Sequence, residues 1–176
     1  MGCIKMKRKR VYLTVGAPGS GKSTWIQNKM KNEPGLWCSR DKVRFSMVRE
    51  DEDYFSKENE VFKKWITYIN NGISSKAHSV IYVDATHISQ ASRNRTLDRL
   101  NLKNVDVIPV IFKTSLEKCI ENNNKRTGRE KVPEEVIRSM YQIFSNSSVS
   151  FGERHTYEEI IVVTDNNVCV VKEGEA

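Results

Sequence analysis

Short apolar runs alternate along the chain with longer stretches in which apolar and polar residues are mixed. The runs predict buried strands, and the mixed stretches predict helices. We expect strands at residues 11–15, 36–38, 80–83, 105–112 and 160–163. Because strands and helices alternate in this order, the pattern favours an α/β fold, in which a parallel sheet of about five strands is covered by helices on both faces.

The helices are placed by periodicity and by signals at their ends. Phe62, Trp65 and Ile69 recur with helical spacing, so one face of that helix is expected to lie in the core. Thr114 and Glu117 match a capping box at the start of a later helix. No linker or internal repeat interrupts the series, so we expect one domain over residues 1–176. Helices are expected at residues 22–31, 40–48, around 62–69, 89–100 and 114–122, and after Pro133.

Residues 16–23 fit the Walker-type pattern G-x-x-x-x-G-K-[ST] at every fixed position. Glycines there let the backbone turn N–H groups toward phosphate oxygens, and the following helix adds its positive N-terminal end. Lys22 is expected to reach the outer phosphates and Ser23 to bind Mg²⁺, so the pattern predicts that the chain uses ATP and Mg²⁺. The residues expected to hold the nucleotide in this loop are Gly16, Gly19, Ser20, Gly21, Lys22, Ser23 and Thr24.

Three acidic or basic residues follow strands and are candidates for phosphoryl-transfer chemistry. Asp41 and Arg44 share one helix face, where a carboxylate can accept the proton of an attacking hydroxyl and an arginine can hold an anionic acceptor. Asp84 ends a strand in the manner of a Walker B carboxylate and would order Mg²⁺ or its water. Spacing alone also allows a helix-start role for Asp41, a surface charge at Arg44 and a turn role for Asp84.

Arg126 and Arg129 lie in a basic, glycine-containing loop between two late helices, within residues 122–132. Without the phosphate loop they would be interpreted as a solvated basic turn. With it, we interpret the segment as a lid that excludes water and places arginine over the donor phosphates.

The net charge of +7 favours polyanionic partners, including nucleic acid. The helix at 89–100 is expected to have a polar face with Arg93, Arg95 and Arg99, and residues 1–10 form a basic flank. No apolar run reaches bilayer length and no signal-peptide core is present, so a cytoplasmic protein is expected, with no membrane partner. The cysteines form no C-x-x-C pair, and Cys38 and Cys169 are expected to behave as small hydrophobes in strand-like runs.

Four segments together resemble the kinase module of bacteriophage and bacterial polynucleotide 5′-kinases: residues 16–25, 39–44, 83–86 and 125–141. The resemblance implies a P-loop kinase-type sheet with a helical lid, and transfer of the γ-phosphate of ATP to 5′-OH ends of single-stranded DNA or RNA in end repair. It implies that Asp41 is the general base, Arg44 contacts the acceptor's phosphate and Arg126 contacts the donor phosphates. If the protein is encoded by a phage, it would act in the host cytoplasm.

The chain departs from that family pattern at two positions. Asn122 stands where such kinases often carry a second lid arginine, four residues before Arg126, unless Arg129 substitutes for it. His87 replaces asparagine in the Asp-x-Thr-Asn pattern that begins at Asp84. The D-x-D-x-T signature of the phosphatase domain does not occur, so kinase activity without phosphatase activity is predicted.

Two other functions stay open. One is a small-molecule P-loop kinase of similar fold, acting on a nucleotide sugar as a toxin-like enzyme would, on a nucleoside or on a sugar acid. The other is a nucleotide-dependent switch that binds ATP and modifies nothing. The preference for DNA or RNA, the use of ATP or GTP, and the oligomeric state are also left open.

Overall fold

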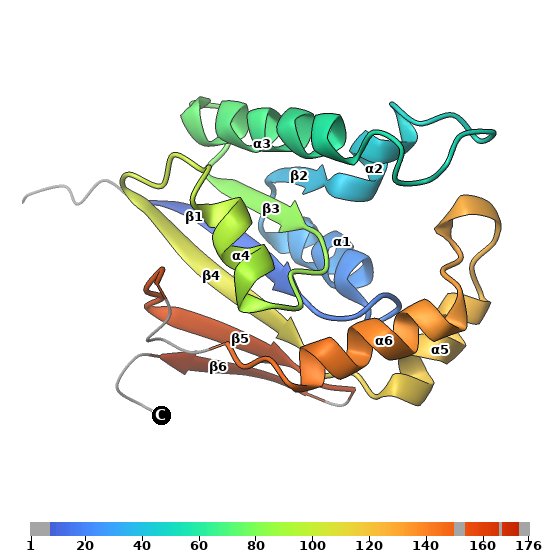
Figure 1. Ribbon diagram of the computed structural model, residues 1–176. Coiled ribbons are helices and arrows are strands. Elements are labelled where there is room, and N and C mark those ends of the chain that lie inside the picture. The colour runs from blue at the N-terminus through green and yellow to red at the C-terminus, as the bar shows by residue number, and fades with distance from the viewer. Residues whose placement is uncertain (1–7, 150–153, 166, 173–176) are drawn as a thin grey trace, which may run out of the picture.

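The computed structural model describes residues 8–149, 154–165 and 167–172 (Figure 1). Its centre is a six-stranded sheet in the order β2-β3-β1-β4-β5-β6. Strands β1 to β5 are parallel, so the predicted α/β class is confirmed. The strands are β1 (Lys9–Val15), β2 (Leu36–Ser39), β3 (Val80–Asp84), β4 (Val105–Phe112), β5 (Glu159–Val163) and β6 (Val168–Lys172).

Helices cover both faces of the sheet because the side chains of the central strands alternate between two apolar layers. Val11 and Leu13 of β1 pack in the layer that includes Trp65, whereas Tyr12 packs in the layer that includes Ile26. Trp65 is fully buried, which confirms the core face expected from helical spacing. The helices are α1 (Lys22–Asn32), α2 (Arg40–Phe45), α3 (Glu58–Ser74), α4 (Gln90–Leu97), α5 (Leu116–Asn124) and α6 (Glu134–Ser145), with a 3₁₀ turn, η1 (Gly128–Glu130).

The sheet has one strand more than the sequence predicted. After β5 the chain turns at Thr164, whose N–H donates to the carbonyl of Asn167 at 2.8 Å, and returns as β6 antiparallel to β5. Val168 and Val170 of this edge strand are 53% and 48% exposed, and Cys169 is exposed as well. The expectation that Cys169 behaves as a buried hydrophobe was therefore wrong, because β6 is held by hydrogen bonds to β5 on the outside of the fold.

The basic flank predicted at residues 1–10 is shorter than expected. Lys9 and Arg10 belong to β1, where Arg10 forms an ion pair with Glu33. Residues 1–7, with Cys3, lie outside the described residues. No helix in the described part of the chain is both long and apolar enough to cross a bilayer.

Two local predictions around α4 and α5 were wrong. Arg93 is not on a solvated face but fully buried, and its guanidinium donates to the carbonyls of His87 at 3.1 Å and Ser148 at 2.7 Å. This contact ties α4 to the segment that follows α6. At α5 the N-cap is Ser115, whose side chain accepts from the backbone N–H of Lys118, so the capping box proposed one residue earlier does not form.

His87 has a structural role in the turn between β3 and α4. Its φ of +43° is uncommon for a residue other than glycine or asparagine, and its ring is buried against Trp65. Nδ1 lies 2.9 Å from the carbonyl of Thr14, and Nε2 lies 3.2 Å from the hydroxyl of Thr96. Burial lowers the pKa of His87 from 6.5 to about 4, so the ring is neutral in the folded protein at pH 7.

The depressed pKa of His87 predicts a specific pH dependence of stability. In the unfolded chain the ring takes up a proton near pH 6.5, whereas in the folded protein it does so near pH 4, so unfolding becomes easier as pH falls between these values. We expect His87→Asn to reduce this loss, because asparagine tolerates positive φ and does not titrate. Urea unfolding at pH 7 and pH 4.5 measures the difference, with His78→Asn as the control. An unchanged pH dependence in His87→Asn would contradict the assignment.

Candidate active site

The loop between β1 and α1 forms an open anion cradle. Gly21 is the N-cap of α1 with φ +92°, and no described side chain caps the free N–H groups of this helix. The first turn of α1 also contains no acidic residue, so its positive end stays available to a ligand. A Cβ at Gly21 would meet no atom within 4 Å, which leaves space for phosphate groups. These features fit the triphosphate of a nucleotide.

The back of this loop is clamped by the helix that leads into the lid. The Thr114 hydroxyl donates to the carbonyl of Ser20 at 2.9 Å, and the Asn122 amide donates to the carbonyl of Gly19, also at 2.9 Å. Gly19, with φ +79°, lies so close to α5 that a Cβ would be 2.2 Å from the carbonyl oxygen of Cys119. Asn122, at the position where the resembling kinases often have an arginine, therefore holds the phosphate loop.

Lys22 is folded under the loop. Its ammonium donates to the carbonyls of Gly16 at 3.0 Å and Ala17 at 2.7 Å. Burial lowers the pKa of Lys22 to about 8, opposed by the nearby charge of Asp84 and assisted by that of Arg126. A bound phosphate would supply the negative charge that this desolvated ammonium lacks.

Ser23 and Asp84 provide oxygen atoms suited to a hard cation. The Ser23 hydroxyl donates to Oδ2 of Asp84 over 3.5 Å, and the indole N–H of Trp37 donates to the same oxygen at 3.0 Å. Asp84 is only 7% exposed, and burial raises its pKa. No group of three or more His, Cys, Asp or Glu side chains that could hold a metal occurs among the described residues. Ser23 and Asp84 would therefore hold Mg²⁺ together with nucleotide phosphates and water, as this ion prefers.

Asp41 is positioned by a buried arginine. Arg44, with a 6% exposed side chain, donates to Oδ1 of Asp41 at 2.6 Å and to Oε2 of Glu58 at 2.6 Å. The Tyr54 hydroxyl donates to the same oxygen of Asp41 at 3.0 Å. Asp41 remains 64% exposed, so it is held in place while still open to a substrate. The alternative of a surface charge at Arg44 is excluded by its burial.

Sequence reasoning missed Tyr54 and Glu58. The segment before α3 reads as an acidic loop, and nothing in its local pattern indicates a contact with α2. One feature of the sequence could have indicated Glu58. It is an acidic residue at the start of α3, where it stabilises the helix end and can also pair with a cation of a neighbouring element.

The lid crosses from the nucleotide side to the acceptor side. Arg126 donates weakly to the carbonyl of Glu130 over 3.5 Å, and its charge lowers the pKa of Lys22, so it lies on the nucleotide side. Arg129 donates to the carbonyl of Val48 at 2.9 Å, and its guanidinium lies 4.9 Å from the Phe45 ring centroid. The two lid arginines therefore face different neighbours.

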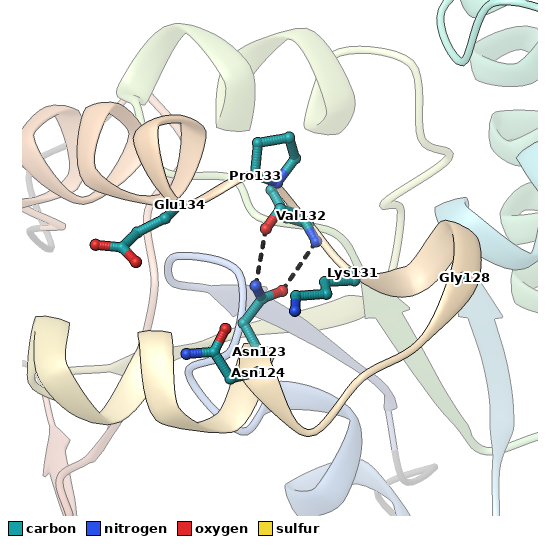
Figure 2. A pocket seen from close by; sticks show the side chains of 7 residues that line it. All are labelled: Asn123, Asn124, Gly128, Lys131, Val132, Pro133 and Glu134. Carbon is teal, nitrogen blue, oxygen red and sulfur yellow. Dashed lines mark hydrogen bonds between the residues drawn. The ribbon is translucent and has the colours of Figure 1, made fainter.

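Asn123 closes the neck of the lid (Figure 2). Its amide donates to the carbonyl of Val132 at 2.8 Å and accepts from the N–H of the same residue at 2.9 Å. A hollow of about 350 Å³ beside this clamp is lined by lid and helix residues, and none of them belongs to the phosphate loop. The clamp fixes both ends of the lid loop, so the residues between them are placed as one unit.

The predicted residues converge at the carboxyl edge of the parallel strands. Ser39, at the end of β2, is in register with Asp84 at the end of β3, which brings the residue after Arg40 to the same edge. Burial lowers the pKa of Lys22 and raises that of Asp84, and the charge of Asp41 contributes to both values, so the three side chains share one electrostatic environment. Ligands of open α/β sheets bind at this edge.

This sheet, loop and pair of carboxylates define a P-loop phosphotransferase that uses ATP and Mg²⁺. Residues 11–146 match the family described as an AAA domain, and the chain belongs to that family. It is thus a small P-loop kinase of this family, and the family itself leaves the acceptor open.

Solved structures share the fold at low sequence identity. A chain of the Pnkp1/Rnl/Hen1 RNA repair complex is 21% identical with a TM-score of 0.70, covering 82% of this chain and 46% of that chain. A chain from the structure of the PezAT toxin–antitoxin system of Streptococcus pneumoniae is 15% identical with a TM-score of 0.67, and the match covers 97% of this chain and 74% of that one. A gluconokinase from Sinorhizobium meliloti 1021 is 15% identical with a TM-score of 0.54, covering 89% and 84%. This chain thus spans less than half the length of the RNA-repair chain.

The contact between Gly19 and α5 predicts that the two left-handed glycines of the loop differ in their tolerance of alanine. Gly19→Ala combines a positive φ with a clash against backbone, whereas Gly21→Ala is strained by φ alone, which costs roughly 1–2 kcal/mol. We expect Gly19→Ala to lower the free energy of unfolding of the ligand-free protein more than Gly21→Ala does. Urea unfolding of both variants and the wild type measures the order, and the reverse order would contradict the steric account.

Proposed function

We propose that the protein is an ATP-dependent polynucleotide kinase that transfers the γ-phosphate to 5′-OH ends of DNA or RNA. The observation that carries the proposal is the position of Asp41. Its Oδ1 is occupied by Arg44 and Tyr54, while no described residue donates to Oδ2. An exposed carboxylate oxygen held at the edge of a phosphate site is suited to accept the proton of an attacking hydroxyl.

Positioning and charge would supply most of the rate, because phosphoryl transfer needs little covalent participation by the protein. Lys22 and Arg126 would bind the oxygens of the transferred group, and Mg²⁺ held by Ser23 and Asp84 would neutralise charge on the donor phosphates. Arg129 would hold the lid against the acceptor side through Val48 and Phe45. In-line transfer then requires the acceptor hydroxyl to lie between Asp41 and the donor phosphate.

Arg44 supports an acceptor that carries a phosphate. Two of its nitrogens bind Asp41 and Glu58, but its Nε is buried with no hydrogen-bond partner among the described residues. Buried N–H groups are rarely left unpaired, so an unpaired one beside a substrate base points to a ligand. A phosphate next to the reacting hydroxyl, as in a nucleotide at a 5′ end, would provide the acceptor atom.

The net charge and the fold likeness agree with this substrate class. A charge of +7 suits a polyanionic acceptor better than a neutral metabolite. The similar chain with the TM-score of 0.70 comes from an RNA repair complex. This chain corresponds to 46% of that one, so only a kinase step is proposed here.

A small-molecule kinase is the second candidate, and coverage favours it. The chain spans 84% of the gluconokinase and 87% of a sugar kinase from Janibacter sp. HTCC2649, so those proteins are of similar size. Such an enzyme would use the same phosphate loop and base, with a sugar acid or a nucleotide sugar as the acceptor. An ATP-binding switch would keep the loop but would not depend on Asp41.

The first test is transfer of labelled phosphate from ATP and Mg²⁺ to a single-stranded 5′-OH oligonucleotide, with a 5′-phosphorylated strand as the blocked control. We expect label on the 5′-OH strand alone. Asp41→Ala should abolish transfer while ATP binding persists, because only the base is removed, and Asp51→Ala serves as a matched exposed control. Label on neither strand, with ATP bound normally, would shift the function to a small-molecule acceptor, and full activity in Asp41→Ala would remove the base.

The lid arginine gives a second, independent prediction. Arg126→Ala should lower turnover by at least roughly 10²-fold, since a positioned arginine stabilises charge on the transferring phosphoryl group. Lys22→Ala should cause a loss of at least the same order. Steady-state rates at saturating ATP measure both, with Arg138→Ala on the exposed face of α6 as the control. A fall of less than tenfold for Arg126→Ala would exclude it from the site.

A further inference from the structure

Three arginine side chains converge on the ring of Phe62 at the surface between α2, α3 and α4. The guanidinium carbons of Arg95, Arg40 and Arg99 lie 4.4, 5.2 and 5.6 Å from the ring centroid. Phe62 is only 4% exposed, so these three side chains form part of its cover. We call Arg40, Arg95 and Arg99 the Phe62 arginine cluster.

Continuous contacts join this cluster to the candidate base. Arg40 forms an ion pair with one carboxylate oxygen of Glu58, and the other oxygen accepts from Arg44 at 2.6 Å. Arg44 in turn donates to Asp41 at 2.6 Å. The cluster therefore begins where the acceptor site ends, on the side of α2 that faces α3 and α4.

The cluster carries positive charge that the protein does not neutralise. The cluster and Arg44 together carry four guanidiniums, and two carboxylates, those of Asp41 and Glu58, pair with Arg40 and Arg44. Asp98, between Arg95 and Arg99 in sequence, does not contribute, because its carboxylate is engaged by other partners, Arg154 and His155. Two positive charges thus remain on this surface.

The excess of positive charge also affects Arg40, through one of its nitrogen atoms and through its pKa. Its Nε is buried and has no hydrogen-bond partner in the described part of the chain. Burial, with the neighbouring charges of Arg44 and Arg95, lowers the pKa of Arg40 to about 10. An anion bound beside the exposed guanidiniums of Arg95 and Arg99 would offset the repulsion between the positive charges.

We propose that the Phe62 arginine cluster binds internucleotide phosphates of the acceptor strand, beyond the nucleotide whose 5′-OH is phosphorylated. The proposal rests on the proposed function and assigns the surface that holds the acceptor strand beyond its terminal nucleotide. Guanidiniums match phosphate oxygens in pairs, and their packing on Phe62 orders them before the ligand arrives. Contacts of this kind position a strand without selecting its sequence.

The test compares acceptors of different length with a charge-removing double variant, Arg95→Gln with Arg99→Gln. Glutamine keeps much of the apolar stem over Phe62. One acceptor is a nucleoside 3′-monophosphate and the other is a 5′-OH oligonucleotide of about twelve nucleotides, a length that covers a typical single-strand site. We expect KM for the oligonucleotide to rise at least about tenfold with kcat unchanged, because each lost phosphate contact weakens binding and leaves the chemical step as it was. For the monophosphate, kcat/KM should stay at the wild-type value.

Salt dependence gives the second readout. With about 0.7 counterions released per phosphate on a single strand, loss of two contacts should reduce the slope of log affinity against log salt by roughly 1.4. The matched control, Arg8→Gln with Arg138→Gln, removes two other arginines with more than 40% exposed side chains, whose ion pairs are with Asp106, Glu158 and Glu134 and not with residues of the cluster. Replacement of Arg95 and Arg99 by lysine should restore most of the slope, because the charge is retained.

The outcomes separate this proposal from the proposed function. An equal loss of kcat/KM for both acceptors would overturn the role of the cluster, and so would an unchanged salt slope. Equal weakening of the binding of a nucleoside diphosphate by the double glutamine variant would overturn it as well. If no oligonucleotide is phosphorylated, the proposed function fails. Binding of the same strand without ATP, measured by fluorescence anisotropy, then decides on the cluster alone: weaker binding in the glutamine variant supports it, and wild-type binding overturns it.

Discussion

The close packing of the phosphate loop against α5 is the constraint on which the site depends. Gly19 lies against the carbonyl of Cys119, where only a hydrogen fits. With the outward carbonyls of Gly19 and Ser20 taken by Asn122 and Thr114, the loop is fixed from behind. Its N–H groups and the start of α1 are left for an anion. The same helix continues into the lid, so the donor site and its cover share one rigid support.

The acceptor side is built on a buried charge. Burying the guanidinium of Arg44 is costly, and contacts with Asp41 and Glu58 compensate for that cost. The arrangement also stabilises α2, a helix of six residues that is far shorter than the roughly 12–15 residues needed for a helix to be stable alone. Glu58 binds both Arg40 and Arg44, which fastens α2 to α3. The exposed carboxylate of Asp41 is thereby held on a short element that could not orient it unaided.

Features encoded by neighbouring residues could be predicted from the sequence. The phosphate loop, the order of strands and helices, and the apolar face of α3 depend on short spacings, and all three are present in the structure. Burial of Arg93 could not be predicted, because its partner Ser148 is 55 residues away. The apolar run around Cys169 indicated a strand, but neither its antiparallel pairing with β5 nor the exposure of its valines could be predicted. The candidate site residues were found by pattern, but the contacts that orient them, from Tyr54 and Glu58, come from a loop and a helix start without a motif.

The two arginines of the lid loop have different neighbours. The charge of Arg126 adds to the lowering of the pKa of Lys22 by burial. Arg129 contacts Val48 and Phe45 at the end of α2. Asn122, where the resembling kinases often carry an arginine, donates to the carbonyl of Gly19 and so holds the phosphate loop. The lid loop is therefore in contact with the end of α2, the helix that carries Asp41 and Arg44. Because Asn123 ties the two ends of the lid loop together, Arg126 and Arg129 are held on one short loop, which has Lys22 near one arginine and the end of α2 in contact with the other.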